Sequence, residues 1–397
     1  GPAPGSRPTL RMVPRRSMQR GGDARLARLV PWIFKNEAAN VEELRAGGHE
    51  TLLANVVSDE GRELGVAACN LQKGGSGGTV NVLGRMLANN SNAAIDQAFF
   101  AARIRQALQT RELLFGTSQP FYRLLNAEGD LLPGVLCDRY GDVLCVQFTS
   151  LAMEQLFQTQ ILDALEALLA PRAIILRCDD VVDRALELAP TRPPVIARGK
   201  YAGPTVVSEG DFLFEVDLLA DRLSMGRIFA ERQYRALVLE ALAHAQGLHG
   251  GKAPRVLSLF GESLGVICAA QGASAVCAEG LGVVTGDRLR ALAERNGCQE
   301  RVQVVALEAP RKEALGSLLG SFDIVTLEAP AMAPTVGKVE KGTQEYSAWM
   351  SVAAAASRPG GLVVLACRSR AMTAVRLLRS ANLGIWAARR RASLVYR

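Results

Sequence analysis

The chain has 397 residues, of which 49% are hydrophobic and 21% charged, and its formal net charge is +7. This composition is that of an ordinary globular protein, and the length suggests two or three domains. It excludes a membrane-spanning helix, because the longest apolar runs, near 351–357 and 362–367, are short and interrupted by arginine, proline and glycine.

The eight cysteines argue against a disulfide scaffold and against a zinc site. They are scattered, they form no Cys-x-x-Cys pair, and only three histidines accompany them. We therefore expect a reducing compartment and no metal ion.

Positive charge gathers at the two ends of the chain. Residues 1–28 carry a balance of +6, residues 346–397 carry +9 with no acidic residue, and the segment between them carries −8. This split indicates an anionic partner at the ends. The Arg-rich start is typical of a transit-peptide remnant or of a disordered basic arm. A tag scar followed by a natural tail is the alternative.

Two small domains are expected after this arm. The first, residues 29–88, is β-rich, because alternating apolar residues predict strands at 51–58, 63–68 and 79–83. The second, residues 92–200, is α+β. Its apolar spacing predicts helices at 93–115, with Asn92 as N-cap, and at 153–169, and strands at 122–126, 134–138, 143–149 and 173–177.

Strands and helices alternate in the third domain, residues 205–397. The expected strands are 256–260, 275–279, 302–307, 322–328 and 362–367, and the expected helices are 230–245, 264–271, 287–296 and 346–357. This alternation predicts right-handed crossovers and a parallel, doubly wound sheet. Ligands bind such sheets beyond the carboxyl ends of the strands, so we expect the chemistry at that edge.

Two stretches carry long runs of specific residues. Residues 31–37 read Pro-Trp-Ile-Phe-Lys-Asn-Glu, and residues 122–142 read Tyr-Arg-Leu-Leu-Asn-Ala-Glu-Gly-Asp-Leu-Leu-Pro-Gly-Val-Leu-Cys-Asp-Arg-Tyr-Gly-Asp. With the domain order, they resemble the three-domain bacterial rRNA (cytosine-5) methyltransferases over about residues 29–370. The resemblance implies an α/β fold class: a PUA-like, RNA-binding β domain, a small α+β linker domain and a class I (Rossmann-like) methyltransferase domain.

The resemblance also implies an S-adenosylmethionine site at the strand ends. Residues 256–265 are similar to the family's Val-Leu-Asp-Leu-Phe-Ser-x-x-Gly-Gly turn, but Ser258 replaces the acid and Leu264 replaces the first glycine of the pair. We expect Leu264 to resist positive φ and to fill ligand space, so that the cofactor does not bind. The positions that match the family's cofactor contacts are Phe260, Gly261, Gly265, Glu279, Glu308 and Glu328. For Glu279 and Glu308 a solvated surface carboxylate is the alternative.

The catalytic segments depart further from the family. There, a cysteine thiolate adds to carbon 6 of cytosine and activates carbon 5. The family's Cys-Ser-Cys-Ser-His is Ala-Cys-Arg-Ser-Arg at residues 366–370, so that Cys367, the candidate catalytic residue, falls between the two family cysteines. A buried small hydrophobe is its alternative role. The family's Gln-Lys-Thr-Gly-Phe-x-x-Asp-Gln-Arg becomes Leu-Ser-Met-Gly-Arg-Ile-Phe-Ala-Glu-Arg at residues 223–232.

These features predict a methyltransferase-like protein that binds RNA without methylating it. We expect a structural or assembly role in an organellar ribosome of the mitochondrial matrix, with rRNA and ribosomal or assembly proteins as partners and no membrane. The cytoplasm is the alternative location. Arginines give affinity for phosphates without reading sequence. The expected RNA-binding residues are Arg11, Arg15, Arg16, Arg20, Arg368, Arg370, Arg389, Arg390 and Arg391.

Two other functions remain open on the sequence. The first is an active S-adenosylmethionine-dependent rRNA (cytosine-5) methyltransferase, in which Glu279, Glu308, Glu328 and Cys367 carry the cofactor and the chemistry. The second is a protein–protein scaffold whose basic ends contact acidic partners.

Overall fold

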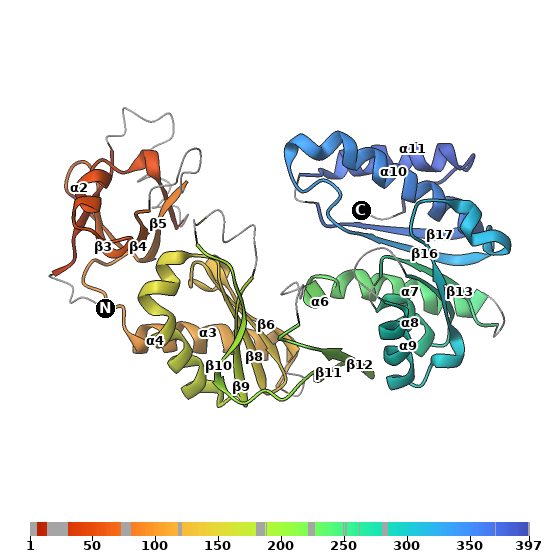
Figure 1. Cartoon of the computed structure of the whole chain (residues 1–397), viewed down its shortest axis with the longest axis horizontal. Helices are drawn as coiled ribbons and strands as arrows, with labels where there is room; N and C mark the ends of the chain where they lie inside the picture. The colour runs from red at the N-terminus through yellow and green to blue at the C-terminus, as the bar shows by residue number, and fades with distance from the viewer. Residues whose placement is uncertain are drawn as a thin grey trace. The chain divides into compact units, whose positions relative to one another are not determined.

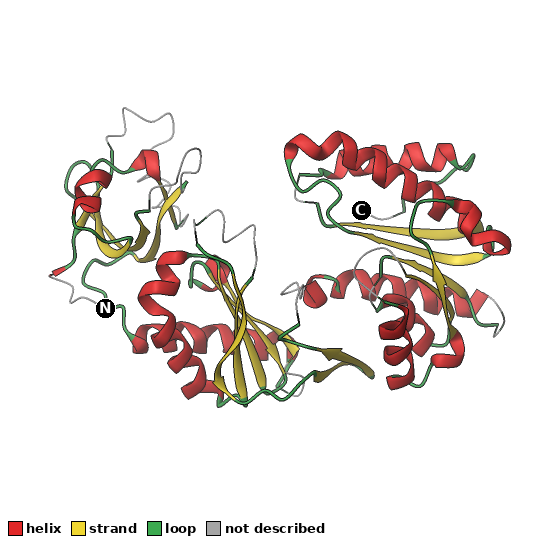
Figure 2. Cartoon of the chain, viewed as in Figure 1, coloured by secondary structure: helices red, strands yellow, loops and turns green. Residues whose placement is uncertain are grey.

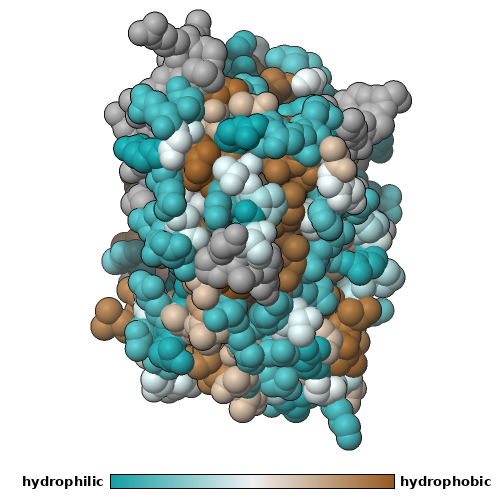
Figure 3. Space-filling view, turned by 90° about the vertical axis from the view of Figure 1, so that its left-hand side faces the viewer, coloured by the Kyte–Doolittle hydropathy of each residue, from teal (hydrophilic) through white to brown (hydrophobic). Residues whose placement is uncertain are grey.

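The structure, a computed structural model, divides the chain into two compact units (Figure 1). The first unit is Gly1–Glu209 with Glu215–Phe229, and the second is Gly210–Phe214 with Ala230–Arg397. The residues that the structure describes are 6–13, 31–72, 81–117, 121–179, 187, 189–220, 227–248, 250, 252–261, 263–279, 285–369 and 371–395. The surface seen in Figure 3 is mainly hydrophilic, with hydrophobic residues in small separate areas.

The first unit begins with a small β domain. Its five-stranded sheet has the order β1-β3-β4-β5-β2. The elements are β1 (Thr9–Arg11), β2 (Trp32–Phe34), α2 (Val41–Ala46), β3 (Thr51–Val57), β4 (Glu63–Asn70) and β5 (Val82–Ala88). The expected β-rich domain is thus present, with its third strand a few residues later than predicted.

The start of the predicted basic arm is part of this sheet. β1 pairs in parallel with β3, and Leu10 between two exposed neighbours is fully buried. The expectation of a tail over all of 1–28 is therefore wrong for residues 9–11, because an alternating Thr-Leu-Arg triplet supplies one core side chain and a strand's hydrogen bonds. Residues 14–30 lie outside the described part of the chain.

The first unit continues with an α+β domain. Its sheet has the order β10-β9-β8-β7-β6, and the two long helices share a hydrophobic core with it that includes Phe100, Ile104, Phe157 and Leu165. The elements are α3 (Gln97–Phe115), β6 (Phe121–Asn126), β7 (Val135–Tyr140), β8 (Val143–Phe148), α4 (Leu151–Leu169), β9 (Ala173–Cys178) and β10 (Arg192–Gly199).

Two features of the α+β domain differ from expectation. Helix α3 is capped by Asp96, whose carboxylate accepts a bond from Phe99 N, and not by Asn92, which lies in the preceding turn. Strand β10 was not predicted because it contains Pro193 and Pro194. Proline is tolerated there because β10 is an edge strand of its sheet.

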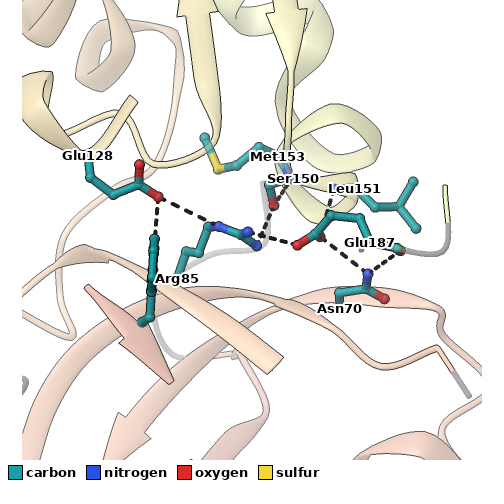
Figure 4. Close-up of polar contacts among 8 residues, drawn as sticks. Asn70, Arg85, Glu128, Ser150, Leu151, Met153 and Glu187 are labelled. Carbon is teal, nitrogen blue, oxygen red and sulfur yellow. Dashed lines mark hydrogen bonds and ion pairs between the residues drawn. The ribbon is translucent and has the colours of Figure 1, made fainter. Parts of the chain in front are cut away.

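A buried polar network joins the β domain to the α+β domain (Figure 4). Arg85 of β5 forms an ion pair of 2.7 Å with Glu187 and donates a 3.2 Å bond to the Ser150 hydroxyl at the start of α4. Asn70 of β4 and the Leu151 amide also donate to Glu187. Since both charged side chains are nearly inaccessible, each needs the other to offset its lost hydration.

The second unit is a three-layer α/β structure, with helices on both faces of one sheet (Figure 2). The sheet has the order β15-β14-β13-β16-β17, and every pairing is parallel, which confirms the predicted doubly wound sheet. The strands are β13 (Arg255–Leu259), β14 (Ser274–Glu279), β15 (Val302–Ala306), β16 (Phe322–Ala329) and β17 (Ser357–Cys367).

The helices of the second unit follow the predicted alternation. One face of the sheet carries α7 (Arg232–Leu248), α8 (Leu264–Ala270) and α9 (Gly286–Arg295), and the other carries α10 (Val339–Ala356) and α11 (Ala374–Ala387) (Figure 1). Helix α6 (Arg227–Ala230) precedes them. Helix α11 was not predicted, and α10 begins seven residues earlier than expected.

A hairpin lies where the chain passes between the units. β11 (Thr205–Glu209) and β12 (Phe212–Val216) form a two-stranded sheet. Within the second unit, Leu213 exchanges two hydrogen bonds with the Asn296 side chain, of 2.8 and 3.0 Å. The predicted boundary at residue 205 therefore does not coincide with the compact units, because 215–229 return to the first one.

Candidate functional site

Polar residues from β13 and β16 meet at the carboxyl edge of the parallel sheet. Ser258 lies near the end of β13 and Glu328 near the end of β16, and their residues are 1% and 3% exposed. The strand order reverses at β13, and doubly wound sheets bind ligands at such a point. We call Ser258, Gly261 and Glu328 the strand-end corner.

Gly261 leaves this corner free of a side chain of its own. A Cβ added there would lie 2.7 Å from Glu328 Oε1 and nearer still to Ser258 Oγ. The Ser258 hydroxyl has no hydrogen-bond partner among the described residues, so a ligand there would satisfy a buried polar group. A hydroxyl and a carboxylate around bare backbone suit an ammonium group, which S-adenosylmethionine carries.

The turn after β13 overturns the expectation for Leu264. Positive φ occurs at Phe260, with φ of 62°, whereas Leu264 is the first residue of helix α8 and needs none. Its side chain is 1% exposed and packs in a hydrophobic cluster with Val238 of α7 and Val256 of β13. Leu264 therefore fills core space, because a helical backbone accepts leucine and the helix–sheet contact needs an apolar side chain.

Gly265 and Glu279 also have local structural roles. A Cβ at Gly265 would lie 2.5 Å from Cys277 Sγ, so glycine permits the close packing of α8 on β14. Glu279 ends β14 and is half-buried, and its Oε2 accepts a 2.6 Å bond from the Gly286 amide at the start of α9. A helix N-terminus favours such a negative charge. Glu308 is exposed beyond β15, and the cofactor roles of all these residues remain predictions.

Acidic and basic side chains follow one another in a row that begins at Glu328 in the strand-end corner. Arg368, directly after β17, forms an ion pair with Glu231, and its Nη2 lies 3.7 Å from Glu328 Oε2. Glu231 also lies within 3.8 Å of the buried Arg235. Glu231 and Arg368 both differ from the family pattern to which residues 223–232 and 366–370 were compared above. Arg368 was expected to bind RNA, whereas its partner Glu231 carries no signal in the sequence because 137 positions separate the two residues.

Cys367 is tied into a hydrogen-bonded cluster at the end of β17. Its thiol lies 3.2 Å from the Tyr346 hydroxyl and accepts a 3.4 Å bond from the Ser369 amide. Tyr346 donates to the Pro330 carbonyl at 2.8 Å, and Ser369 Oγ accepts from the Ala333 amide at 2.9 Å. The cluster thereby joins the segments that follow β16 and β17.

Tyr346 combines a core ring with a polar group at this edge. The residue is fully buried on α10. Burial raises the pKa of the Tyr346 hydroxyl to about 12, so it stays protonated at neutral pH. Helical periodicity alone does not reveal that this hydroxyl reaches Cys367.

The predicted RNA-binding arginines lie in different environments. Arg389 and Arg391 are exposed, whereas Arg390 donates a 3.0 Å bond to the Ser357 carbonyl. Arg11 forms a 2.5 Å ion pair with Glu43 in the β domain. The remaining predicted residues, Arg15, Arg16, Arg20 and Arg370, lie outside the described residues.

Side chains of the family-like stretch 122–142 form contacts that hold the first unit together. Asp130 accepts a 2.7 Å bond from Arg111 of α3, and the buried Asp138 pairs with Arg123 at 2.7 Å. Glu128 accepts a 2.8 Å bond from the indole of Trp32, which belongs to the other family-like stretch. The two stretches that carried the resemblance are therefore in direct contact.

Neither a metal site nor a membrane helix is found in the described part of the chain. No group of three or more His, Cys, Asp or Glu side chains there could hold a metal ion, and none of its helices is long and apolar enough to cross a membrane.

Curated sequences similar to this chain are ribosomal RNA methyltransferases. Ribosomal RNA large subunit methyltransferase I from Shewanella denitrificans is 26% identical over 359 residues, covering 89% of this chain and 85% of that protein. A ribosomal RNA large subunit methyltransferase from Deinococcus radiodurans is 29% identical, covering 73% of this chain and 71% of that protein. The chain thus resembles large-subunit rRNA methyltransferases along most of its length. No family model matches it.

Solved structures confirm the predicted fold class. The crystal structure of the methyltransferase SMU.776, complexed with SAH, has a TM-score of 0.67 at 17% identity and covers 95% of this chain and 90% of that chain. A SAM-dependent methyltransferase from Streptococcus mutans has a TM-score of 0.65 at 18% identity, with the same coverage. At these identities the likeness concerns the fold alone.

Proposed function

We propose that this chain is an S-adenosylmethionine-dependent methyltransferase that acts on large-subunit ribosomal RNA. The observation that carries the proposal is its similarity, over 85% of the relative's length, to a protein named for that activity. This favours the enzymatic alternative drawn from the sequence over the loss of activity that we expected. The strand-end corner supports it, because its polar groups fit one end of the cofactor.

The residues of the corner suggest how the cofactor would be held. The Glu328 carboxylate and the Ser258 hydroxyl would bind its ammonium group, and Gly261 would let the ligand approach the backbone. Glu279, at the end of the neighbouring β14, has a carboxylate for the ribose hydroxyls. When bound, the cofactor supplies an electrophilic methyl group, and this chain's residues orient it and exclude water.

A second candidate function is RNA binding without methyl transfer. It is favoured by the state of the catalytic segment, where Cys367 is hydrogen-bonded to Tyr346 and Ser369, and Arg368 is paired with Glu231. A thiol held in this way has to leave these partners before it adds to a pyrimidine ring. The role in an organellar ribosome and the mitochondrial location belong to this candidate and stay predictions.

Titration calorimetry with S-adenosylhomocysteine tests the first proposal. We expect saturable binding that Glu328→Gln weakens about ten- to a hundredfold, because a charge-assisted contact is lost. 5′-Methylthioadenosine, which lacks the amino-acid group, should bind wild type and variant equally. Absence of any heat with S-adenosylhomocysteine would contradict the proposal and favour the non-catalytic candidate.

Methyl transfer to large-subunit rRNA tests the chemistry. With radiolabelled cofactor we expect incorporation into rRNA by the wild type. Cys367→Ala then separates two outcomes: loss of transfer with intact cofactor binding assigns the nucleophile to Cys367, and retained transfer assigns the reaction to an acceptor atom that needs no thiolate.

A further inference from the structure

Helix α11 carries a stripe of basic and apolar side chains on its outer face. Arg379, Leu383 and Trp386 are spaced by four and three residues, so they lie on one side of the helix. Trp386 is 80% exposed and Leu383 is 45% exposed. We call these three residues the α11 stripe. Because most of its indole is exposed, Trp386 contributes little hydrophobic burial to the fold, and its ring is available to contact a ligand.

The other face of α11 fixes the stripe on a rigid support. Ser380, Ala381 and Gly384 are buried against α10, and a Cβ at Gly384 would lie 2.7 Å from Met350 Cβ. Such close packing leaves little freedom for the helix to roll. The stripe is therefore a preorganised surface and not a flexible tail.

The exposed arginines of α11 and of the residues after it form no ion pair within the described part of the chain. Arg376, Arg379, Arg389 and Arg391 are exposed, and within the described residues none of their side chains forms an ion pair or a hydrogen bond. No acidic residue occurs from 346 to 397. By contrast, the exposed Arg172 of the first unit pairs with Asp142 at 3.0 Å. Unpaired guanidinium groups in such number suit a polyanion.

A groove of about 490 Å³ lies beside the stripe, between α10, α11 and residues 310–313. Arg379 and Leu383 belong to both the groove and the stripe, so the space continues the same surface. The groove is thus a space that could hold a sugar or a base next to the ring of Trp386. Its charged lining residues are Arg311, Lys312, Glu313, Glu340 and Arg379, three of which are cationic.

We propose that the α11 stripe binds a single-stranded segment of RNA, with one unpaired base stacked on Trp386 and the neighbouring phosphates on Arg376, Arg379, Arg389 and Arg391. Surfaces that bind single strands combine an aromatic platform with a cationic track, and both are present here. The inference rests on the proposed function in taking RNA as its ligand. It concerns a surface built from α11, whereas the strand-end corner is built from β13 and β16.

Fluorescence anisotropy with a short, labelled single-stranded RNA, measured over a series of salt concentrations, tests the inference. Trp386→Ala should lower the affinity at least about fivefold without changing the salt dependence, because stacking releases no counterions. Trp386→Phe should keep most of the affinity. Replacing both Arg379 and Arg389 by Gln should reduce the slope of log K against log salt by about 1.4, since each lost phosphate contact contributes about 0.7 for single strands.

Two variants of the first unit serve as matched controls. Leu113→Ala removes an apolar side chain that is 86% exposed on α3, and Arg172→Gln removes a surface arginine that already has a partner. Both should leave affinity and salt slope unchanged. As a second readout, RNA should quench a component of tryptophan emission in the wild type that is missing in Trp386→Phe.

Wild-type affinity in Trp386→Ala would overturn the inference. So would self-association of the wild type, seen by sedimentation and lost in Trp386→Ala while RNA affinity is kept, because the stripe would then bind a second copy of the chain. Failure of this inference can be distinguished from failure of the proposed function. Trp386→Ala should bind S-adenosylhomocysteine like the wild type, and a wild type without cofactor binding would leave the RNA result standing.

Discussion

Glu231 and Arg368, separated by 137 positions in the sequence, form an ion pair at the carboxyl edge of the second unit's sheet. Glu231 comes directly before α7 and Arg368 directly after β17, so the pair joins the segment before this helix to the end of the last strand of the sheet. Their side chains are 15% and 29% exposed, so that the pair is only partly screened by water.

Removal of either partner should destabilise the second unit. Glu231→Gln and Arg368→Gln should each lower the free energy of unfolding by about 1–3 kcal/mol, because a partly buried charge loses its partner. Urea denaturation of the two single variants and the double variant should give a coupling energy of at least about 0.5 kcal/mol. Strict additivity would show that the pair contributes nothing. Arg172→Gln, which breaks the exposed pair with Asp142, should cost at most about 1 kcal/mol.

Gly261 should not tolerate a methyl group. In Gly261→Ala the new Cβ would lie 2.7 Å from Glu328 Oε1, and relief of this overlap should cost about 1–3 kcal/mol of stability and abolish binding of S-adenosylhomocysteine. Thermal unfolding and calorimetry measure the two effects. Gly337→Ala is the matched control, because a Cβ there has nothing within 4 Å. Normal cofactor binding by Gly261→Ala would remove the corner from the candidate site.

The buried pair of Arg85 and Glu187 should matter more than any surface pair. Glu187→Gln leaves the buried Arg85 guanidinium with only the more distant Glu128 carboxylate, 3.8 Å away, and should lower the free energy of unfolding of the first unit by about 3 kcal/mol. Chemical denaturation followed by tryptophan emission reports this change when the transition of Trp32→Phe is subtracted, because Trp32 lies in the same unit and the other two tryptophans do not. Asp163→Asn, which breaks a more exposed pair with Arg198, should cost less than about 1 kcal/mol. Equal effects of the two variants would contradict the role we assign to burial.

Stability should decrease as the solution becomes strongly alkaline, above about pH 9. Burial raises the pKa of the Cys69, Cys268 and Cys277 thiols to about 12 from an ordinary value of 9.0. Between these values the unfolded chain loses protons that the folded chain retains, so the free energy of unfolding falls as pH rises from about 9 towards 12. Denaturation at several pH values should show this fall, and it should be smaller in Cys69→Ala. A pH-independent stability above pH 9 would be inconsistent with buried thiols.

The sequence was most informative where one rule decides the structure. The central strands of the second unit, β13, β14 and β16, are buried apolar runs, and helices separate its five strands along the chain. A parallel sheet covered by helices on both faces satisfies both patterns. The strand β10 escaped prediction because two prolines usually exclude a strand, and only tertiary structure shows that it lies at an edge. The prediction for Leu264 was wrong because the family pattern suggested a positive φ at this position. In this chain Leu264 begins helix α8 and does not need a positive φ.

The candidate site was predictable in position but not in detail. Strand ends could be located, so Ser258 and Glu328 were placed at the correct edge. How close Ser258 and Glu328 lie depends on the register between β13 and β16, in which Ser258 pairs with Thr326. The sequence of one strand does not determine its register with another. The partner of Arg368 was missed for the same reason, since 137 positions separate it from Glu231.

The path of the chain at the β11–β12 hairpin limits where the protein can be divided into separately expressed fragments. Because Gly210–Phe214 belong to the second unit while Glu215–Phe229 belong to the first, the chain crosses between them three times. A fragment that starts at Ala230 would lose the two bonds that hold Asn296 to Leu213. Expression of the second unit alone, or a chimera with a relative, would therefore have to begin at or before Gly210.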